Sequence, residues 1–178
     1  RMERGEGFRF LMAYDVGQDR LFNLGNRISG HPYWWSDSQR ILTVKRPEGD
    51  PRWVYRRLVL QDSRTGRAEP LFDPLIQGPG HPSLSPDGRW VATDAFVIDP
   101  ATYESETAVI YVGNPRTGAL TEILRLDHPF SGADYSSIRR GQPHPVWSPD
   151  SKKLLINFNH GGEHMSLLLL EDFIRPAE

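Results

Sequence analysis

The chain has 178 residues, 38% of them hydrophobic and 25% charged, which is typical of a folded globular protein and argues against disorder. The formal net charge of -2 gives no basic excess, so we expect no nucleic-acid partner. No apolar run is long enough to cross a bilayer, and we expect no membrane partner. The absence of cysteine excludes disulfides and thiolate metal sites and leaves the compartment, cytoplasmic or periplasmic, open.

In chain order, the first predicted element is a hairpin in residues 8–30, where an apolar run from Phe10 ends at Asp15. It is a degenerate copy of a pattern in which an apolar strand leads into a polar turn. In two copies of this pattern the turn contains the sequence Arg-Thr-Gly. Further copies lie at 58–66, 110–118 and 166–172. The pattern is typical of two strands joined by a tight turn.

A second pattern alternates with the first. It begins with His-Pro and has a large apolar residue at its fourth position, Asp at its seventh and Gly or Ser at its eighth. Copies lie at 31–42, 81–92 and 144–155. Its Ser-Pro-Asp-Gly core is typical of a turn, because Pro presets φ, Asp accepts local hydrogen bonds and Gly tolerates positive φ. We therefore predict a short strand before each turn and another after it.

Together the two patterns predict an all-β chain built from units of four antiparallel strands. Units that repeat about every 40 to 50 residues are typical of β-propeller blades. We predict a partial β-propeller of about three to four blades over 1–178, which is part of a larger closed ring. Its predicted parts are a partial blade (8–30), a blade (31–80), a blade with inserted loops (81–143) and a partial blade (144–178).

Three to four blades are fewer than most closed propellers contain. An open ring would leave a sheet face without its neighbour, so we expect the remaining blades to come from missing chain or from another subunit. Arg1 precedes the first methionine, which indicates that the chain begins inside a longer sequence.

The histidines of the second pattern are candidate metal ligands. His31, His81 and His144 occupy one repeat position, and equivalent positions of a propeller converge around its central channel. Neutral imidazole suits Zn, Mn, Fe, Cu or Ni, and the amide oxygen of Gln142 could complete the set. The predicted cofactor is a divalent metal, Mn, Zn or Ca. The alternative is that His-Pro is a repeated turn element whose imidazole caps a backbone carbonyl.

The repeats also resemble a known group. The Ser-Pro-Asp-Gly hairpins resemble the WD40-like repeats of TolB-type propellers, and segments 80–94 and 142–150 resemble those of oligogalacturonate lyases and ulvan-lyase-like propellers. This resemblance implies a seven-bladed ring with a metal held largely by histidines on its axis, which maps onto His81 and His144. The lyases usually have a further metal ligand beside the second histidine. This chain has Arg139, Arg140 and Gly141 there and so departs from the lyase pattern.

Two further groups are candidates for substrate contact. The loop before His144 supplies an imidazole, a phenol and two guanidiniums: His128, Tyr135, Arg139 and Arg140. The arginines could bind a uronate carboxylate, and Tyr135 or His128 could transfer protons; the alternative is a solvated connecting loop.

Four aromatic side chains divide between contact and core. Strand alternation predicts that Tyr33 and Trp35 contact a sugar, whereas Trp34 and Trp147 pack between blades.

Three functions fit the sequence. The first is a polysaccharide-lyase-like propeller that carries out metal-assisted β-elimination on uronate-containing oligosaccharides. The second is a non-enzymatic TolB-like scaffold that binds a protein or peptide partner. The third is the propeller part of a larger hydrolase.

Overall fold

A computed structural model describes residues 11–25, 31–47, 55–78, 80–99, 105–127, 142–160 and 164–173. All the regular elements in these ranges are β strands, which confirms the all-β fold class, and none is a helix able to span a membrane. The strands are β1 (Met12–Asp15), β2 (Arg20–Asn23), β3 (Tyr33–Trp34), β4 (Arg40–Lys45), β5 (Tyr55–Asp62), β6 (Ala68–Pro70), β7 (Ile76–Gln77), β8 (Ser83–Leu84), β9 (Val91–Ile98), β10 (Ser105–Asn114), β11 (Ala119–Asp127), β12 (Val146–Trp147), β13 (Leu154–His160) and β14 (His164–Leu170).

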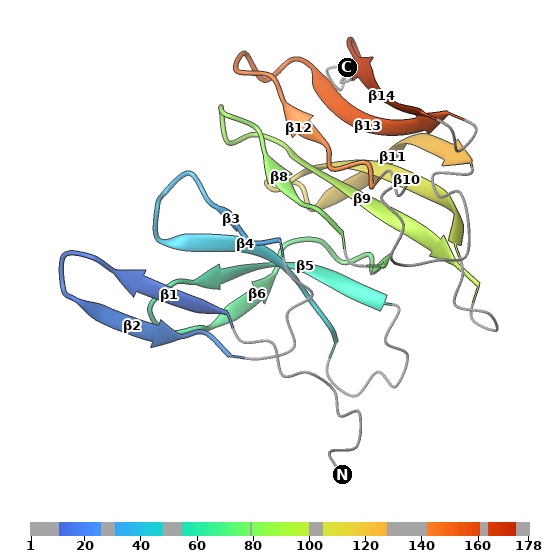
Figure 1. Ribbon diagram of the computed structural model, residues 1–178. Helices are drawn as coiled ribbons and strands as arrows, with labels where there is room; N and C mark the ends of the chain where they lie inside the picture. The colour runs from blue at the N-terminus through green and yellow to red at the C-terminus, as the bar shows by residue number, and fades with distance from the viewer. Residues whose placement is uncertain are drawn as a thin grey trace.

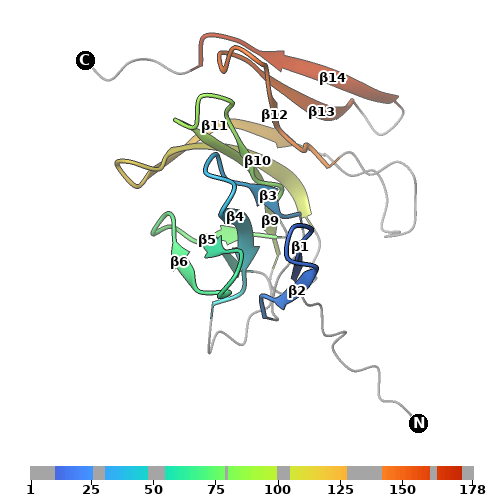
Figure 2. The same cartoon turned by 90° about the vertical axis from the view of Figure 1, so that its left-hand side faces the viewer.

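The described strands form antiparallel sheets that follow one another along the chain. A β1–β2 hairpin is followed by the sheet β3-β4-β5-β6, in which β7 also pairs with β5, then by β8-β9-β10-β11 and by β12-β13-β14. Figures 1 and 2 show these sheets arranged successively around one axis, as propeller blades are. The short first strands of neighbouring sheets are in contact, β3 with β8 and β8 with β12.

Apolar side chains fill the space between neighbouring sheets. One cluster, which includes Leu42, Phe72 and Leu84, joins the β3–β7 sheet to the β8–β11 sheet. Two others, around Ile110 and Val112, join the β8–β11 sheet to the β12–β14 sheet. The core is therefore divided into layers between blades, and the inner strands of each blade are fixed by packing on both neighbours.

The turns form as the repeat predicts. The carboxylate of Asp87 accepts hydrogen bonds from Ser85 Oγ at 2.6 Å and from the Arg89 N–H at 3.0 Å, and Asp150 binds Ser148 and Lys152 in the same way. The eighth repeat position has a left-handed backbone in all three copies, with φ of 56° at Ser38, 70° at Gly88 and 61° at Ser151. The turns between β3 and β4, β8 and β9, and β12 and β13 lie on one side of the molecule (Figure 1). The His-Pro segments therefore enter on the other side.

The predicted orientation of the tryptophan pair was wrong. Trp34 is 55% exposed, whereas Trp35 is 9% exposed and packs in the cluster between the first two full sheets. At the fourth repeat position, Leu84 and Trp147 pack as expected against the preceding sheet. Trp34 pairs with Ile41 on the side where the described residues provide only the two-stranded β1–β2 hairpin, which does not cover it.

Candidate functional site: the histidine cluster

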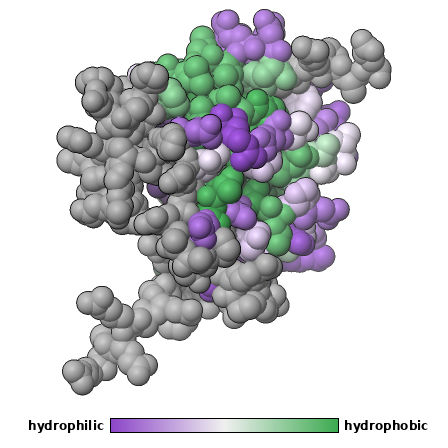
Figure 3. Space-filling view, turned by 90° about the vertical axis from the view of Figure 1, so that its right-hand side faces the viewer, coloured by the Kyte–Doolittle hydropathy of each residue, from purple (hydrophilic) through white to green (hydrophobic). Residues whose placement is uncertain are grey.

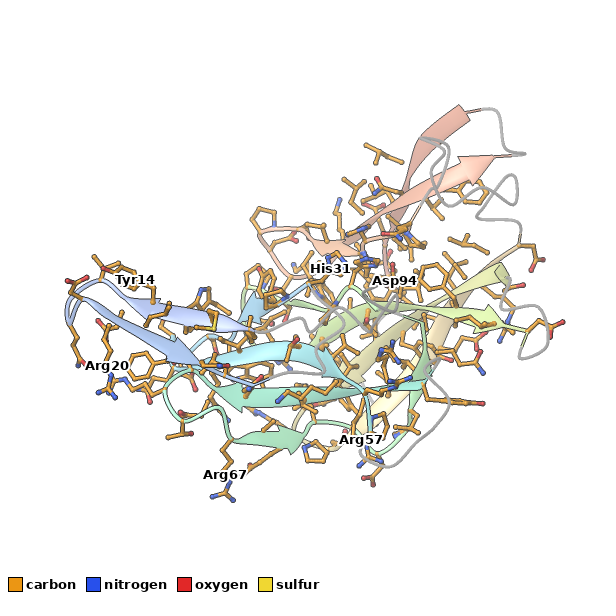
Figure 4. All side chains as sticks on the ribbon, turned by 60° about the horizontal axis from the view of Figure 1, so that its bottom comes forward. Tyr14, Arg20, His31, Arg57, Arg67 and Asp94 are labelled. Carbon is orange, nitrogen blue, oxygen red and sulfur yellow. The ribbon has the colours of Figure 1, made fainter. Side chains whose placement is uncertain are left out.

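The three repeated histidines come together although they lie far apart in the sequence. The ring centroids of His31 and His81 are 4.2 Å apart, those of His31 and His144 are 5.6 Å apart, and those of His81 and His144 are 3.5 Å apart. Each histidine lies two residues before the first strand of its sheet, separated from it by a proline, and these strands are neighbours around the axis. Figure 4 shows His31 and Asp94 together where three sheets meet. The structure thus brings together the residues that the sequence proposed as ligands.

The backbone at these positions is unusual. His31 and His144 have positive φ values of 59° and 44°, a region that few non-glycine residues adopt. In the middle copy the left-handed residue is Gly80, with a φ of 63°, where an added Cβ would lie 2.8 Å from Ile76 Cδ1. Such conformations cost free energy and persist where the surrounding structure holds them, often at functional sites.

A fully buried carboxylate holds two of the histidines in place. Asp94, on β9, is 0% exposed, and its Oδ1 accepts the backbone N–H of His81 at 2.7 Å. The Nδ1 atom of His81 lies 2.9 Å from Oδ1 and 2.7 Å from Oδ2. Oδ2 also accepts the backbone N–H of His144 at 3.1 Å. Asp94 was not among the predicted site residues; the signal was an acidic residue inside a mostly apolar strand.

The third copy is held by amides. Nε2 of His144 lies 3.1 Å from Oε1 of Gln142, so the predicted fourth ligand is next to the cluster. Asn157 donates its side-chain amide to the Gln142 carbonyl at 3.2 Å and its backbone N–H to the Pro143 carbonyl at 2.8 Å. Asn157 occupies the same repeat position as Asp94, and both hold the segment that carries a histidine.

The electrostatics of the cluster favour neutral imidazole at His144. Burial lowers the pKa of His144, and the neighbouring His81 and, to a smaller extent, His31 lower it further. The carboxylate of Asp94 acts in the opposite direction without reversing the shift. A neutral ring has a free lone pair on one nitrogen, and the neutral ring is the form of histidine that binds a metal.

The donor set fits a divalent transition metal, although the rings do not surround one point as they stand. Nε2 of His81 is buried and has no hydrogen-bond partner in the part of the chain that the structure describes. The rings of His31 and His144 lie beside the His81 ring, and the amide oxygen of Gln142 lies next to Nε2 of His144. Among the described residues, no three His, Cys, Asp or Glu side chains are placed to hold an ion. The cause is visible in the rings: His81 and His144 stack with an interplanar angle of 28°. Binding would require one ring to turn.

The other predicted site residues are divided. Tyr33 is 46% exposed and can contact a ligand. Trp35 packs in the core and cannot. The remaining predicted residues, His128, Tyr135, Arg139 and Arg140, lie outside the described residues.

Comparison with known proteins places the fold. No protein-family model matches the chain. An oligogalacturonate lyase in complex with manganese superposes with a TM-score of 0.63 at 18% identity, over 90% of this chain and 40% of the lyase. The oligogalacturonate lyase of Vibrio parahaemolyticus gives 0.66 at 13% identity, over 90% and 41%, and TolB from Acinetobacter baumannii gives 0.58 at 14%, over 89% and 34%.

The curated relatives are of another kind. Dipeptidyl-peptidase 5 of Aspergillus oryzae and the probable dipeptidyl-peptidase 5 of Aspergillus flavus are each 31% identical over 115 residues, which is 63% of this chain and 15% of the relative. The chain therefore spans less than half of each of these proteins.

The fold and the repeats together define a β-propeller, of which this chain is a part. Its structure is similar to those of TolB and of oligogalacturonate lyases.

Proposed function

We propose that the histidine cluster binds a divalent transition metal ion and that the propeller acts on uronate-containing oligosaccharides by β-elimination. The observation that carries this proposal is the convergence of His31, His81 and His144, with Nε2 of His81 buried and without a hydrogen-bond partner among the described residues. The likeness to an oligogalacturonate lyase in complex with manganese supports it.

The donor set indicates which metals are suitable. Imidazole nitrogen is a good ligand for Zn²⁺ and Mn²⁺, whereas Ca²⁺ takes oxygen ligands almost exclusively. Three imidazoles and one amide oxygen therefore favour Mn or Zn over Ca. His31, His81 and His144 would hold the ion, with Gln142 as the fourth ligand.

In β-elimination a base removes the proton α to the uronate carboxylate, and the glycosidic oxygen at the β-carbon departs. A bound divalent cation neutralises the carboxylate, which makes the α proton more acidic. The exposed ring of Tyr33 can stack on a sugar. The predicted proton-transfer groups are Tyr135 or His128, and the predicted carboxylate-binding groups are Arg139 and Arg140.

The test is metal binding followed by a lyase assay. Elemental analysis and Mn²⁺ titration are done on the wild-type chain and on the variant His81→Ala with His144→Ala. We expect one bound ion in the wild type and none in the variant. Tyr14→Ala, which removes an exposed ring from the β1–β2 hairpin far from His31 (Figure 4), is the control and should bind normally. Unsaturated uronate product from pectic or ulvan oligomers would then establish the reaction.

A second function has its own support: a non-enzymatic scaffold, or the propeller part of a peptidase, that binds a protein or peptide. It is favoured by the similarity to dipeptidyl-peptidase 5 and by histidine rings that stack on one another. A protein that binds no metal and forms no unsaturated product, with its fold intact, would support this reading and overturn the first.

A further inference from the structure

We infer that Asp94 is a positioning residue that fixes the tautomer of His81, so that the lone pair of His81 lies on Nε2, inside the histidine cluster. The consequence of this tautomer for metal binding rests on the proposed function, whereas the assignment of the tautomer does not. The arrangement resembles the carboxylate–histidine pairs that orient metal-binding imidazoles in other proteins.

The hydrogen-bond inventory leads to this tautomer. An ionised carboxylate only accepts hydrogen bonds, and both oxygens of Asp94 lie within 2.9 Å of Nδ1 of His81. Nδ1 must therefore carry the proton that is donated. In the neutral ring the lone pair is then on Nε2, an atom that is buried and that no described residue meets with a hydrogen bond.

The same carboxylate also joins two repeats. Its Oδ2 accepts the His144 N–H from a residue 50 positions later, while its Oδ1 accepts the His81 N–H. Both His-Pro turns are thereby held on one side chain. A change at Asp94 therefore affects the relative placement of the two stacked rings as well as the proton on one of them.

A purely structural role would be repeated from blade to blade, as the turn aspartates are. The repeat position of Asp94, thirteen residues after the histidine, is filled by Val44 in the first copy and by Asn157 in the third. Val44 is fully buried in the core, and Asn157 bonds the Gln142 carbonyl, not a histidine ring. Only the middle copy has a carboxylate at this position, and Nε2 of its histidine is buried without a hydrogen-bond partner among the described residues.

Asp94→Asn tests the inference with the smallest change of shape. The amide oxygen is expected at the Oδ1 position, because the His81 N–H at 2.7 Å requires an acceptor there. The amide nitrogen then lies at the Oδ2 position and donates to Nδ1 of His81. The Oδ2 position is the nearer one to Nδ1, at 2.7 Å against 2.9 Å for Oδ1, so we expect the ring to change tautomer and its proton to move to Nε2. The His144 N–H also loses its acceptor, so some loss of stability is expected.

The direct readout is a long-range ¹H–¹⁵N spectrum of the histidine rings in metal-free protein. Wild type is expected to show His81 protonated at Nδ1, and Asp94→Asn to show it protonated at Nε2. The wild-type spectrum decides even if the variant does not fold: a His81 ring protonated at Nε2 in the folded wild type overturns the inference. Asp150→Asn, the same substitution in a turn, should leave the His81 signals unchanged.

Metal affinity is the second readout. If wild type binds Mn²⁺, Asp94→Asn should bind it about 10- to 100-fold more weakly, as for other residues behind metal-binding histidines, while Asp150→Asn binds normally. Unchanged affinity and an unchanged tautomer in the variant would overturn the inference and leave the proposed metal site intact. The expected tautomers without any metal binding would support the inference and overturn the proposed function.

Discussion

The interior sheet β8–β11 and the outer sheet β12–β14 carry the same sequence repeat but are buried to different degrees. Six consecutive residues of β9, from Val91 to Phe96, are buried, because a sheet packs on each face. On β13 burial alternates: Leu154 and Ile156 are fully buried, and Leu155 between them is 39% exposed. Alternation of this kind is what a sheet with one covered face shows.

The bare face of the outer sheet is apolar. Cross-strand pairing places Val146 opposite Leu155 and Leu155 opposite Leu169, so these three share one face with Leu167, which is 66% exposed. Figure 3 shows hydrophobic surface in the upper part of the molecule, the end at which this sheet lies. Such a surface is what a further blade would cover.

The comparison also explains where a charge can be buried. Asp94 is fully enclosed because β9 has a sheet on both sides, and its partners come from two His-Pro turns. In the outer sheet the same position holds the neutral, half-buried Asn157. A carboxylate whose oxygens are all hydrogen-bonded is tolerable inside the protein, whereas an unpaired one is not.

The largest expected difference in stability is between two variants, one that truncates a buried apolar side chain and one that truncates an exposed one. Ile110→Ala, between the interior and outer sheets, should lower the free energy of unfolding by about 2–5 kcal/mol, because it leaves a cavity. Leu167→Ala should lower it by less than about 0.5 kcal/mol. Urea unfolding of the 178-residue chain, followed by fluorescence, measures both.

An equal loss of unfolding free energy in the two variants would contradict the difference in burial between the two sheets. It would mean that the outer face of the β12–β14 sheet is covered in solution. Size-exclusion chromatography would then show whether a second copy provides the cover. A Leu167→Lys variant that dissociates such an assembly would locate the contact on this face.

A medium effect is expected where the two sheets are joined by a hydrogen bond near the site. Ser83 Oγ, on β8, donates to the Pro145 carbonyl at 2.7 Å, and both groups are buried. Ser83→Ala should cost about 1–3 kcal/mol, because the carbonyl loses its partner. Ser63→Ala is the control. It also removes a serine hydroxyl, but in the turn between β5 and β6, which belong to one sheet. A loss no larger than that of the control would show that the bond contributes nothing to sheet association.

Much of this architecture could be predicted from the repeat. The turns follow from local chemistry, and the convergence of His31, His81 and His144 follows from the equivalence of positions in successive blades. The paired strands and the packing of Leu84 and Trp147 follow from the same periodicity.

What could not be predicted depends on contacts between repeats. The role of Asp94 requires knowing that His144 lies beside it, which no local pattern indicates. The orientation of Trp34 and Trp35 depends on which face of the first full sheet has a neighbour, and alternation alone does not settle that. The stacking of the His81 and His144 rings depends on side-chain torsions that the repeat leaves free.

The smallest expected effect concerns acid sensitivity of the turns. The hydrogen bond from Ser148 Oγ, and then that from the Lys152 N–H, lower the pKa of Asp150 below its usual value. Burial raises the pKa of Asp87 in the interior sheet, but the bonds from Ser85 Oγ and the Arg89 N–H outweigh it, and the net shift is also downward.

A carboxyl with a lowered folded pKa adds stability above its unfolded pKa of roughly 4, and that stability is lost as the pH falls through the folded pKa. Asp150→Asn should therefore be less stable than wild type at pH 7, with the difference shrinking towards pH 3. Urea midpoints at the two pH values measure this, and Asp87→Asn should behave in the same direction. A difference that stays constant with pH would show that the carboxylate charge does not stabilise the turn, and that the Ser-Pro-Asp geometry alone is sufficient in both sheets.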